Sequence, residues 1–182
     1  FNDDDRYMGK GISYCALCDG NLYKGQNVAV VGGGNSAMEE ALYLSDICKN
    51  VTIINRNNEF KGEQTLIDSI LSKNNINCVY NSNVCEYNIE NGKLTSVKLD
   101  SENELEVSGL FISIGSVPSA EIFDVQKEKG FIIVDNECMT NIENVYACGD
   151  VIKKNVYQLT TATGEGTTVA YSIIRKVKNN KK

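Results

Sequence analysis

The chain contains no histidine and only one proline among its 182 residues. None of its apolar runs approaches the roughly 20 residues that a membrane-spanning helix needs, so we expect no membrane association. Basic residues are also scarce, because 18 of them stand against 24 acidic residues and leave a net charge of −6. Nucleic-acid partners select for basic surfaces, so we expect no nucleic-acid partner either.

A signal peptide and an initiator methionine are also lacking at the first residues, Phe1 to Arg6, and we expect the sequence to begin inside a longer chain. The seven cysteines are an odd number for the disulfide framework of a secreted protein. Five of them stand apart, each beside an apolar residue, and we interpret them as small buried side chains in a reducing cytoplasm. These five are Cys48, Cys78, Cys85, Cys138 and Cys148.

A strand, a glycine turn, a helix and a second strand are predicted between residues 28 and 54. The apolar run 28–31 is typical of a fully buried strand, as is 51–54. Residues 35–44 have a helix-forming composition that places Ala37, Ala41 and Leu44 on one face. This succession over about thirty residues is a right-handed βαβ unit, so the predicted fold class is α/β.

A hairpin is predicted from the alternating segments 84–90 and 94–99. Asn91-Gly92 lies between them and suits a type I′ turn, which needs positive φ at both central residues. Further helices are expected at 60–73 and 160–177, and further strands at 76–80, 105–107, 110–114, 131–134 and 145–148. We interpret 116–119, which contains Pro118, as a connection between domains. The domain division itself is expected near residue 108.

Two cysteines form a close pair in Cys15-Ala16-Leu17-Cys18. If a helix begins at Cys18, the two sulfurs can bond without backbone strain, and the helix N-terminus stabilises a thiolate. Thiolates are the species that attack disulfides, and Asp19 supplies a carboxylate that can shuttle protons. The pair therefore predicts a redox-active dithiol. A zinc half-site and an inert structural pair remain as alternatives, although zinc needs four cysteine or histidine ligands.

The glycine turn fits the G-x-G-x-x-A pattern directly after a strand and before a helix. Gly32 permits the tight turn, Gly34 lets the backbone approach a pyrophosphate, and Ala37 allows the helix to pack closely. A tight turn without a ligand is the alternative interpretation. The predicted dinucleotide-binding residues are Gly32, Gly33, Gly34, Asn35, Ser36 and Ala37.

The end of the second strand predicts which dinucleotide binds. NAD-binding units usually carry an acidic residue there, whereas this chain has Asn55-Arg56-Asn57 and then Lys61. Arg56 and Lys61 can pair with a 2′-phosphate, which favours NADP(H) over NAD(H). The alternative is that both are ordinary surface charges.

Three segments together resemble the low-molecular-weight thioredoxin reductase family. They are 11–20 with its CxxCDG sequence, 30–37 with GGGNSA, and 145–151 with CGD. They follow in the family's order over nearly the whole chain. The resemblance implies a homodimeric flavoprotein with two Rossmann-like domains. Residues 1–107 would be a three-layer NADPH-binding domain carrying the dithiol, and 108–182 the C-terminal part of a split FAD-binding domain.

The resemblance also implies roles. Electrons would pass from NADPH to FAD, to the dithiol and then to thioredoxin. Cys18 would face the flavin, Cys15 would attack thioredoxin, and Asp19 would donate a proton. The residues expected to contact FAD are Gly149, Asp150, Gln158, Leu159 and Thr160.

Two departures from the family pattern leave alternatives open. The N-terminal half of the FAD domain is missing from this sequence, so we expect this chain alone to hold FAD weakly or not at all and to be inactive. The family's His-Arg-Arg motif followed by Arg is reduced to Arg56 and Lys61, and lysine lacks arginine's planar fork. The reduced motif leaves a ferredoxin-dependent flavin thioredoxin reductase as an alternative. A flavoprotein component of a peroxide-reducing system, which shares the same motifs, is another. A non-catalytic dinucleotide-binding module is the alternative from another class.

Overall fold

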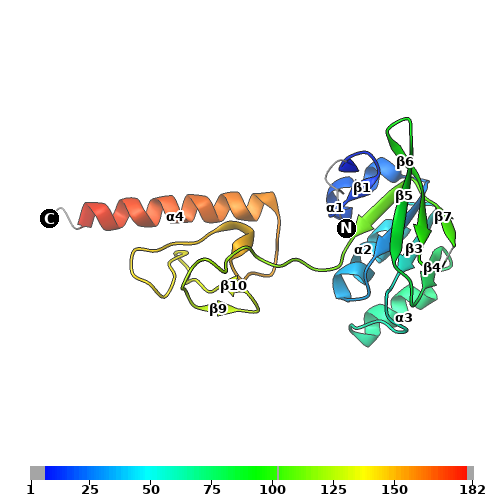
Figure 1. Cartoon of the computed structure of the whole chain (residues 1–182). Coiled ribbons are helices and arrows are strands. Elements are labelled where there is room, and N and C mark those ends of the chain that lie inside the picture. Colours follow the sequence, from blue (N-terminus) through cyan, green and yellow to red (C-terminus); the bar gives the residue numbers. More distant parts are fainter. Residues whose placement is uncertain (1–6, 102, 180–182) are drawn as a thin grey trace. The chain divides into compact units, whose positions relative to one another are not determined.

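The computed structural model describes residues 7–101 and 103–179, and the chain divides into two compact units, 1–115 and 116–182 (Figure 1). The first six residues, on which we based the expectation of a longer chain, lie outside this range. The division falls at the predicted Pro118 connection and corrects the expected boundary at 107/108. The reason is that strand β8 (Gly109–Ile112) is buried throughout and lies between β1 (Ile12–Ser13) and β2 (Asn27–Val31) in one sheet.

The first unit is built on a parallel five-stranded sheet with the order β1-β8-β2-β3-β4. Its other strands are β3 (Asn50–Ile54) and β4 (Ile76–Val79). Val30 in the centre pairs with Ile53 on one side and Phe111 on the other. Strands covered on both faces need apolar residues at successive positions, which explains the run at 28–31. The predicted α/β fold class is confirmed.

Two different layers cover the faces of this sheet. Val30, Ile53 and Phe111 pack on one face with the helices α1 (Ala16–Asp19), α2 (Asn35–Ser45) and α3 (Gln64–Ser72). Ala29, Ile54 and their neighbours pack on the other face with an antiparallel sheet. That sheet consists of β5 (Val84–Glu90), β6 (Lys93–Leu99) and β7 (Glu104–Glu106). The unit therefore has three layers, and the second covering layer is a sheet instead of helices.

The β5–β6 hairpin has the predicted turn, with φ of 50° at Asn91 and 75° at Gly92. Its first strand corrects one expectation, because Cys85 is exposed and not buried. A register shift between Val84 and Glu86 interrupts the alternation of the strand and turns Cys85 toward solvent. Of the other isolated cysteines, Cys48 and Cys138 are buried, whereas Cys78 and Cys148 are only partly buried.

The second unit has a small core and one long helix. Its elements are β9 (Lys127–Glu128), β10 (Phe131–Ile132), a 3₁₀ turn η3 (Gly149–Val151) and α4 (Leu159–Asn179). Ala120, Ile132 and Ile152 form the core, and α4 buries only Ser172. The strands expected at 131–134 and 145–148 are thus shortened to two residues and to a single bridge between Met139 and Tyr146. None of the described helices is both long and apolar enough to cross a membrane.

Candidate functional site

Cys15 and Cys18 form a disulfide at the start of α1, with 5.3 Å between their Cα atoms. Cys15 is the N-cap of the helix, and its Sγ accepts the backbone N–H of Cys18 at 3.1 Å. The helix begins at Ala16 and not at Cys18, because Cys15 caps it and a three-residue spacing places the third helical amide over the capping atom. That amide points at the sulfur of Cys15, where it would stabilise a thiolate after reduction.

The disulfide is accessible from solvent in this unit. Cys18 is exposed, Cys15 is half-buried, and Leu17 between them is 65% exposed. Tyr14 and Leu22 nearby in the sequence are also exposed apolar side chains. An exposed disulfide flanked by apolar surface is a geometry that another protein can reach.

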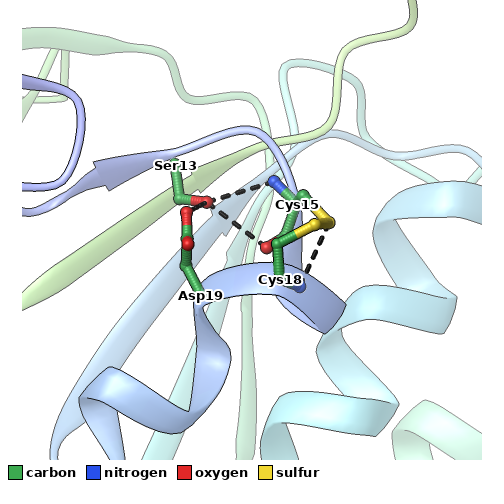
Figure 2. The surroundings of a disulfide bond; sticks show 4 residues. All are labelled: Ser13, Cys15, Cys18 and Asp19. Atoms are coloured by element: carbon green, nitrogen blue, oxygen red, sulfur yellow. Dashed lines mark hydrogen bonds between the residues drawn. A yellow bond between two sulfur atoms is a disulfide. The ribbon is translucent and has the colours of Figure 1, made fainter. Parts of the chain in front are cut away.

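Asp19 lies beside Ser13, in a hydrogen-bonded group that includes backbone atoms of Cys15 (Figure 2). The buried hydroxyl of Ser13 donates to Asp19 Oδ2 at 2.7 Å and accepts the Cys15 N–H at 3.1 Å. Tyr23 is buried, and its burial and then the charge of Asp19 raise the pKa of its phenol. The structure thus links the predicted proton donor, through Ser13, to the backbone of Cys15. Sequence reasoning missed Ser13, because its two-residue strand gives no periodic signal.

Glu40 on α2 is a second carboxylate near the dithiol that sequence reasoning missed. Burial raises the pKa of its carboxyl, and a weaker hydrogen bond from the Ala16 backbone lowers it. Its Oε2 is buried and has no hydrogen-bond partner among the described residues. An unpaired buried oxygen favours the protonated form of the group.

We expect the Glu40→Gln variant to gain thermal stability over the wild type as pH rises. The folded-state pKa lies above that of the unfolded chain, so the unfolded chain binds fewer protons in the titration window. Wild-type stability therefore falls with rising pH, whereas glutamine does not titrate. Calorimetry at pH 4 and pH 8 should show the variant's Tm gaining a few degrees relative to wild type at the higher pH. An unchanged difference between the two pH values would contradict this.

The glycine turn forms one wall of a cleft of about 440 Å³ at the carboxyl ends of β2 and β3. Gly32 has φ of 150°, and a Cβ there would lie 2.2 Å from the Ser113 carbonyl oxygen and 2.8 Å from Ala37 Cβ. Gly34 differs, because a Cβ there would meet only the Lys61 carbonyl oxygen at 3.8 Å. The protein's own packing therefore requires glycine at 32 but leaves space at 34. That open space beside the start of α2 fits the close approach of a pyrophosphate.

The opposite wall carries Arg56 and Lys61, both exposed at the cleft. Asn55 is 1% exposed, and its amide is used locally, donating to Glu59 O at 2.8 Å and accepting the Asn57 N–H at 3.1 Å. It therefore holds the turn instead of facing a ribose. The Lys61 backbone N–H donates to Gly33 O at 2.7 Å, so this loop is fixed to the glycine turn. Two cations are thus presented to the cleft by an anchored loop.

Asn35 at the start of α2 is tied to the same loop. Its side chain accepts the Glu63 N–H at 2.9 Å and donates to Glu63 Oε1 at 3.2 Å. Ser36 and Ala37 follow on α2, with Ser36 exposed and lining the cleft and Ala37 buried. All six predicted residues of the turn therefore lie at the cleft or pack directly beneath it.

The residues predicted to contact FAD gather in the second unit. Gly149 has φ of 81°, and its N–H donates to Glu165 Oε2 at 2.8 Å. Lys154 Nζ lies 3.0 Å from Glu165 and 3.1 Å from Asp150, whose side chain stays 66% exposed. Burial lowers the pKa of Lys154, but hydrogen bonds to these two carboxylates outweigh it and raise the pKa. Sequence reasoning missed both Lys154 and Glu165.

Gln158, Leu159 and Thr160 lie where predicted, at the start of α4. The Thr161 hydroxyl accepts the Gln158 N–H at 3.2 Å and donates to Gln158 O at 2.7 Å, which fixes this first turn. Leu159 is 80% exposed. A Cβ at Gly149 would meet nothing closer than Ala162 at 4.0 Å. The surface at Gly149 and at Leu159 is therefore open to a ligand.

A polar cleft of about 700 Å³ lies between the start of β2 and the β6–β7 hairpin, away from the dithiol and the glycine turn. Its Glu104 is bonded to Ser96 and Asn88, which lowers the pKa of the carboxyl. In the part of the chain that the structure describes, no group of three or more Cys, Asp or Glu residues is arranged to hold a metal ion.

Comparison with known proteins gives consistent results. A family model described as pyridine nucleotide-disulphide oxidoreductase matches residues 3–166. The thioredoxin reductase of Listeria innocua is 38% identical over 171 residues, 90% of this chain and 54% of that protein. The solved thioredoxin reductase of Streptococcus pyogenes superposes with a TM-score of 0.85 at 30% identity, over 93% of this chain and 58% of that one.

A ferredoxin-flavin thioredoxin reductase from Clostridium acetobutylicum superposes less closely, with a TM-score of 0.53 at 31% identity. This superposition covers 97% of this chain and 58% of that protein. The chain thus spans little more than half the length of the relatives it matches.

Proposed function

The chain belongs to the pyridine nucleotide-disulphide oxidoreductase family, and on that premise we propose that it is part of a flavin-dependent thioredoxin-disulfide reductase. NADPH would deliver electrons through FAD to Cys15 and Cys18, and the dithiol would reduce a thioredoxin-like protein. The observation that carries the proposal is the exposed Cys15–Cys18 disulfide, which has a carboxylate and a helical amide beside it. We further propose a homodimeric full-length protein in the cytoplasm, where isolated thiols stay reduced.

The dithiol's own residues suit disulfide exchange. Cys15 accepts the helical N–H of Cys18, which favours its thiolate and makes it the attacking sulfur. A mixed disulfide would then form between Cys15 and the partner. Cys18, the more exposed of the two, resolves it by attacking Cys15, and Asp19 protonates the partner's leaving thiolate.

FAD, when bound, would supply the two-electron carrier between nucleotide and dithiol. Asp150 offers an exposed carboxylate for its ribityl hydroxyls, and Gly149 lets the backbone approach. Gln158 precedes α4, and the backbone amides of Leu159 and Thr160 in its first turn would favour an anionic ring. That this chain alone holds FAD weakly stays a prediction.

Arg56 and Lys61 support NADPH as the electron donor, because they place two cations at the cleft beside the glycine turn. We expect Arg56→Ala to weaken NADPH binding about tenfold and to leave NADH binding nearly unchanged, since a guanidinium–phosphate pair is lost. Stopped-flow reduction of the flavin in the full-length protein, with each nucleotide, measures this. Arg175→Ala is the matched control, because it removes an exposed arginine outside the cleft that is paired with Glu137.

A ferredoxin-dependent reductase is the second candidate, supported by the loss of one arginine from the family motif and by the similar Clostridium acetobutylicum protein. Reduced ferredoxin should be included in the same stopped-flow series. Flavin reduction by ferredoxin alone, with no response to either nucleotide, would replace NADPH in the proposal. A peroxide-reducing system remains a further candidate for the electron acceptor.

A further inference from the structure

A single buried hydroxyl connects the dithiol to its carboxylate. Ser13 is 1% exposed, and its Oγ lies 2.7 Å from Asp19 Oδ2, 3.1 Å from the Cys15 nitrogen and 3.3 Å from the Cys15 carbonyl oxygen (Figure 2). Three polar atoms of two functional residues therefore converge on one oxygen.

The hydroxyl has one proton, so it can donate to only one of its two acceptors at a time. The shorter contact, to a carboxylate, is the stronger bond, because charge-assisted hydrogen bonds exceed those to neutral carbonyls. The Cys15 N–H occupies one lone pair on Oγ and thereby leaves the proton free to point at Asp19. Ser13 is thus oriented by Cys15 and in turn orients Asp19.

The position of Ser13 makes this arrangement rigid. It ends β1 and pairs in register with Phe111 of the buried strand β8. A side chain on a sheet strand is positioned more precisely than one on a loop. The Asp19 carboxylate, which is hydrogen-bonded to the Ser13 side chain, is therefore also restricted in position. Asp19 itself is only partly buried and would otherwise have its side-chain rotamers available.

We propose that Ser13 is a positioning residue that holds Asp19 Oδ2 and so directs the transferable proton to Oδ1, in fixed geometry to Cys15. This inference rests on the proposed function. In the step concerned, the ionised Asp19 takes the proton of the Cys18 thiol on Oδ1, the resulting thiolate attacks Cys15 Sγ, and the bond between Cys15 and the partner's sulfur breaks. The electron pair stays on the partner's sulfur, which takes the proton from Asp19 Oδ1. The carboxylate left behind is stabilised by the Ser13 hydroxyl.

The test is a double-mutant cycle of Ser13→Ala, Asp19→Asn and the double variant, made in the full chain. Each protein is reduced with dithiothreitol, desalted and mixed with an oxidised thioredoxin in a stopped-flow fluorimeter. The chain has no tryptophan, so the tryptophan signal reports on the thioredoxin alone. Ser45→Ala is the matched control, because Ser45 is also a buried serine but donates to Leu42 O, within α2.

We expect Ser13→Ala to slow thioredoxin reduction about tenfold, part of what a well-placed general acid contributes. Ser45→Ala should match the wild type. In the Asp19→Asn background, Ser13→Ala should have no further effect, because groups that act as one unit are not additive. An unchanged rate for Ser13→Ala, or the same tenfold loss in both backgrounds, would overturn the proposal. Thermal melts compared with Ser45→Ala identify a folding defect, and the cycle still separates it from an effect through Asp19.

A second substrate separates this inference from the proposed function. The same variants are mixed with oxidised glutathione, whose reduction also needs an attacking thiolate and a proton for the leaving sulfur but no docking of a protein. If the wild type reduces glutathione and not thioredoxin, the proposed partner is wrong and the cycle is decided on glutathione. If it reduces neither, both proposals fail.

Discussion

Replacing Cys15 with serine is expected to abolish thioredoxin reduction, with a loss of about a thousandfold or more, because the attacking nucleophile is removed. The Cys18→Ser variant should be equally inactive in turnover but for another reason. Its Cys15 can still attack, whereas no second thiol is available to resolve the product. It should therefore accumulate a mixed disulfide with thioredoxin, visible on a non-reducing gel, that Cys15→Ser does not form.

Two other cysteines provide controls for that experiment. Cys85 is exposed and unpaired with another cysteine, so Cys85→Ser should retain full activity. Cys48 is buried, and burial raises the pKa of its thiol to about 11, which leaves almost no thiolate at neutral pH. Trapping of thioredoxin by Cys15→Ser, and not by Cys18→Ser, would reverse the assigned roles. Full activity of both variants would exclude the dithiol from the reaction.

Several elements of the first unit could be predicted from sequence because their signals are local. The apolar run 28–31, the helix face of Ala37, Ala41 and Leu44, and the Asn91-Gly92 turn each follow from residue order and backbone sterics. The start of the parallel sheet could not be predicted in this way. β1 has two residues, and its membership depends on pairing with β8, about a hundred residues later in the chain.

The same limit applies to the candidate site. The close spacing of Cys15, Cys18 and Asp19 is visible in the sequence, and so is the glycine turn. Ser13 and Glu40 could not be found, because their roles depend on how β1 and α2 pack around α1. In the second unit, the strand predicted at 145–148 does not form beyond one bridge, for a related reason. An apolar segment becomes a strand only where a neighbour offers a ladder of hydrogen bonds, and Tyr146 has one bridge.

Two glycines of the glycine turn allow an effect on stability to be distinguished from an effect on nucleotide binding, because they tolerate an added methyl group differently. Gly34→Ala should leave the Tm nearly unchanged, since a Cβ there meets only Lys61 O at 3.8 Å. It should nevertheless weaken NADP(H) binding about tenfold to a hundredfold, because the methyl group would occupy space that the pyrophosphate needs. Isothermal titration with NADP⁺ measures the loss.

Gly32→Ala should, in contrast, lower the thermal stability of the protein. Its Cβ would lie 2.2 Å from the backbone oxygen of Ser113, which cannot rotate away, and the backbone has φ of 150°. Overpacking of this kind costs about 3 kcal/mol, so the melting temperature should fall by several degrees whether or not nucleotide is present. If Gly34→Ala binds NADP⁺ as the wild type does, or if the wild type does not bind it, the turn is a structural element and the nucleotide site must be given up.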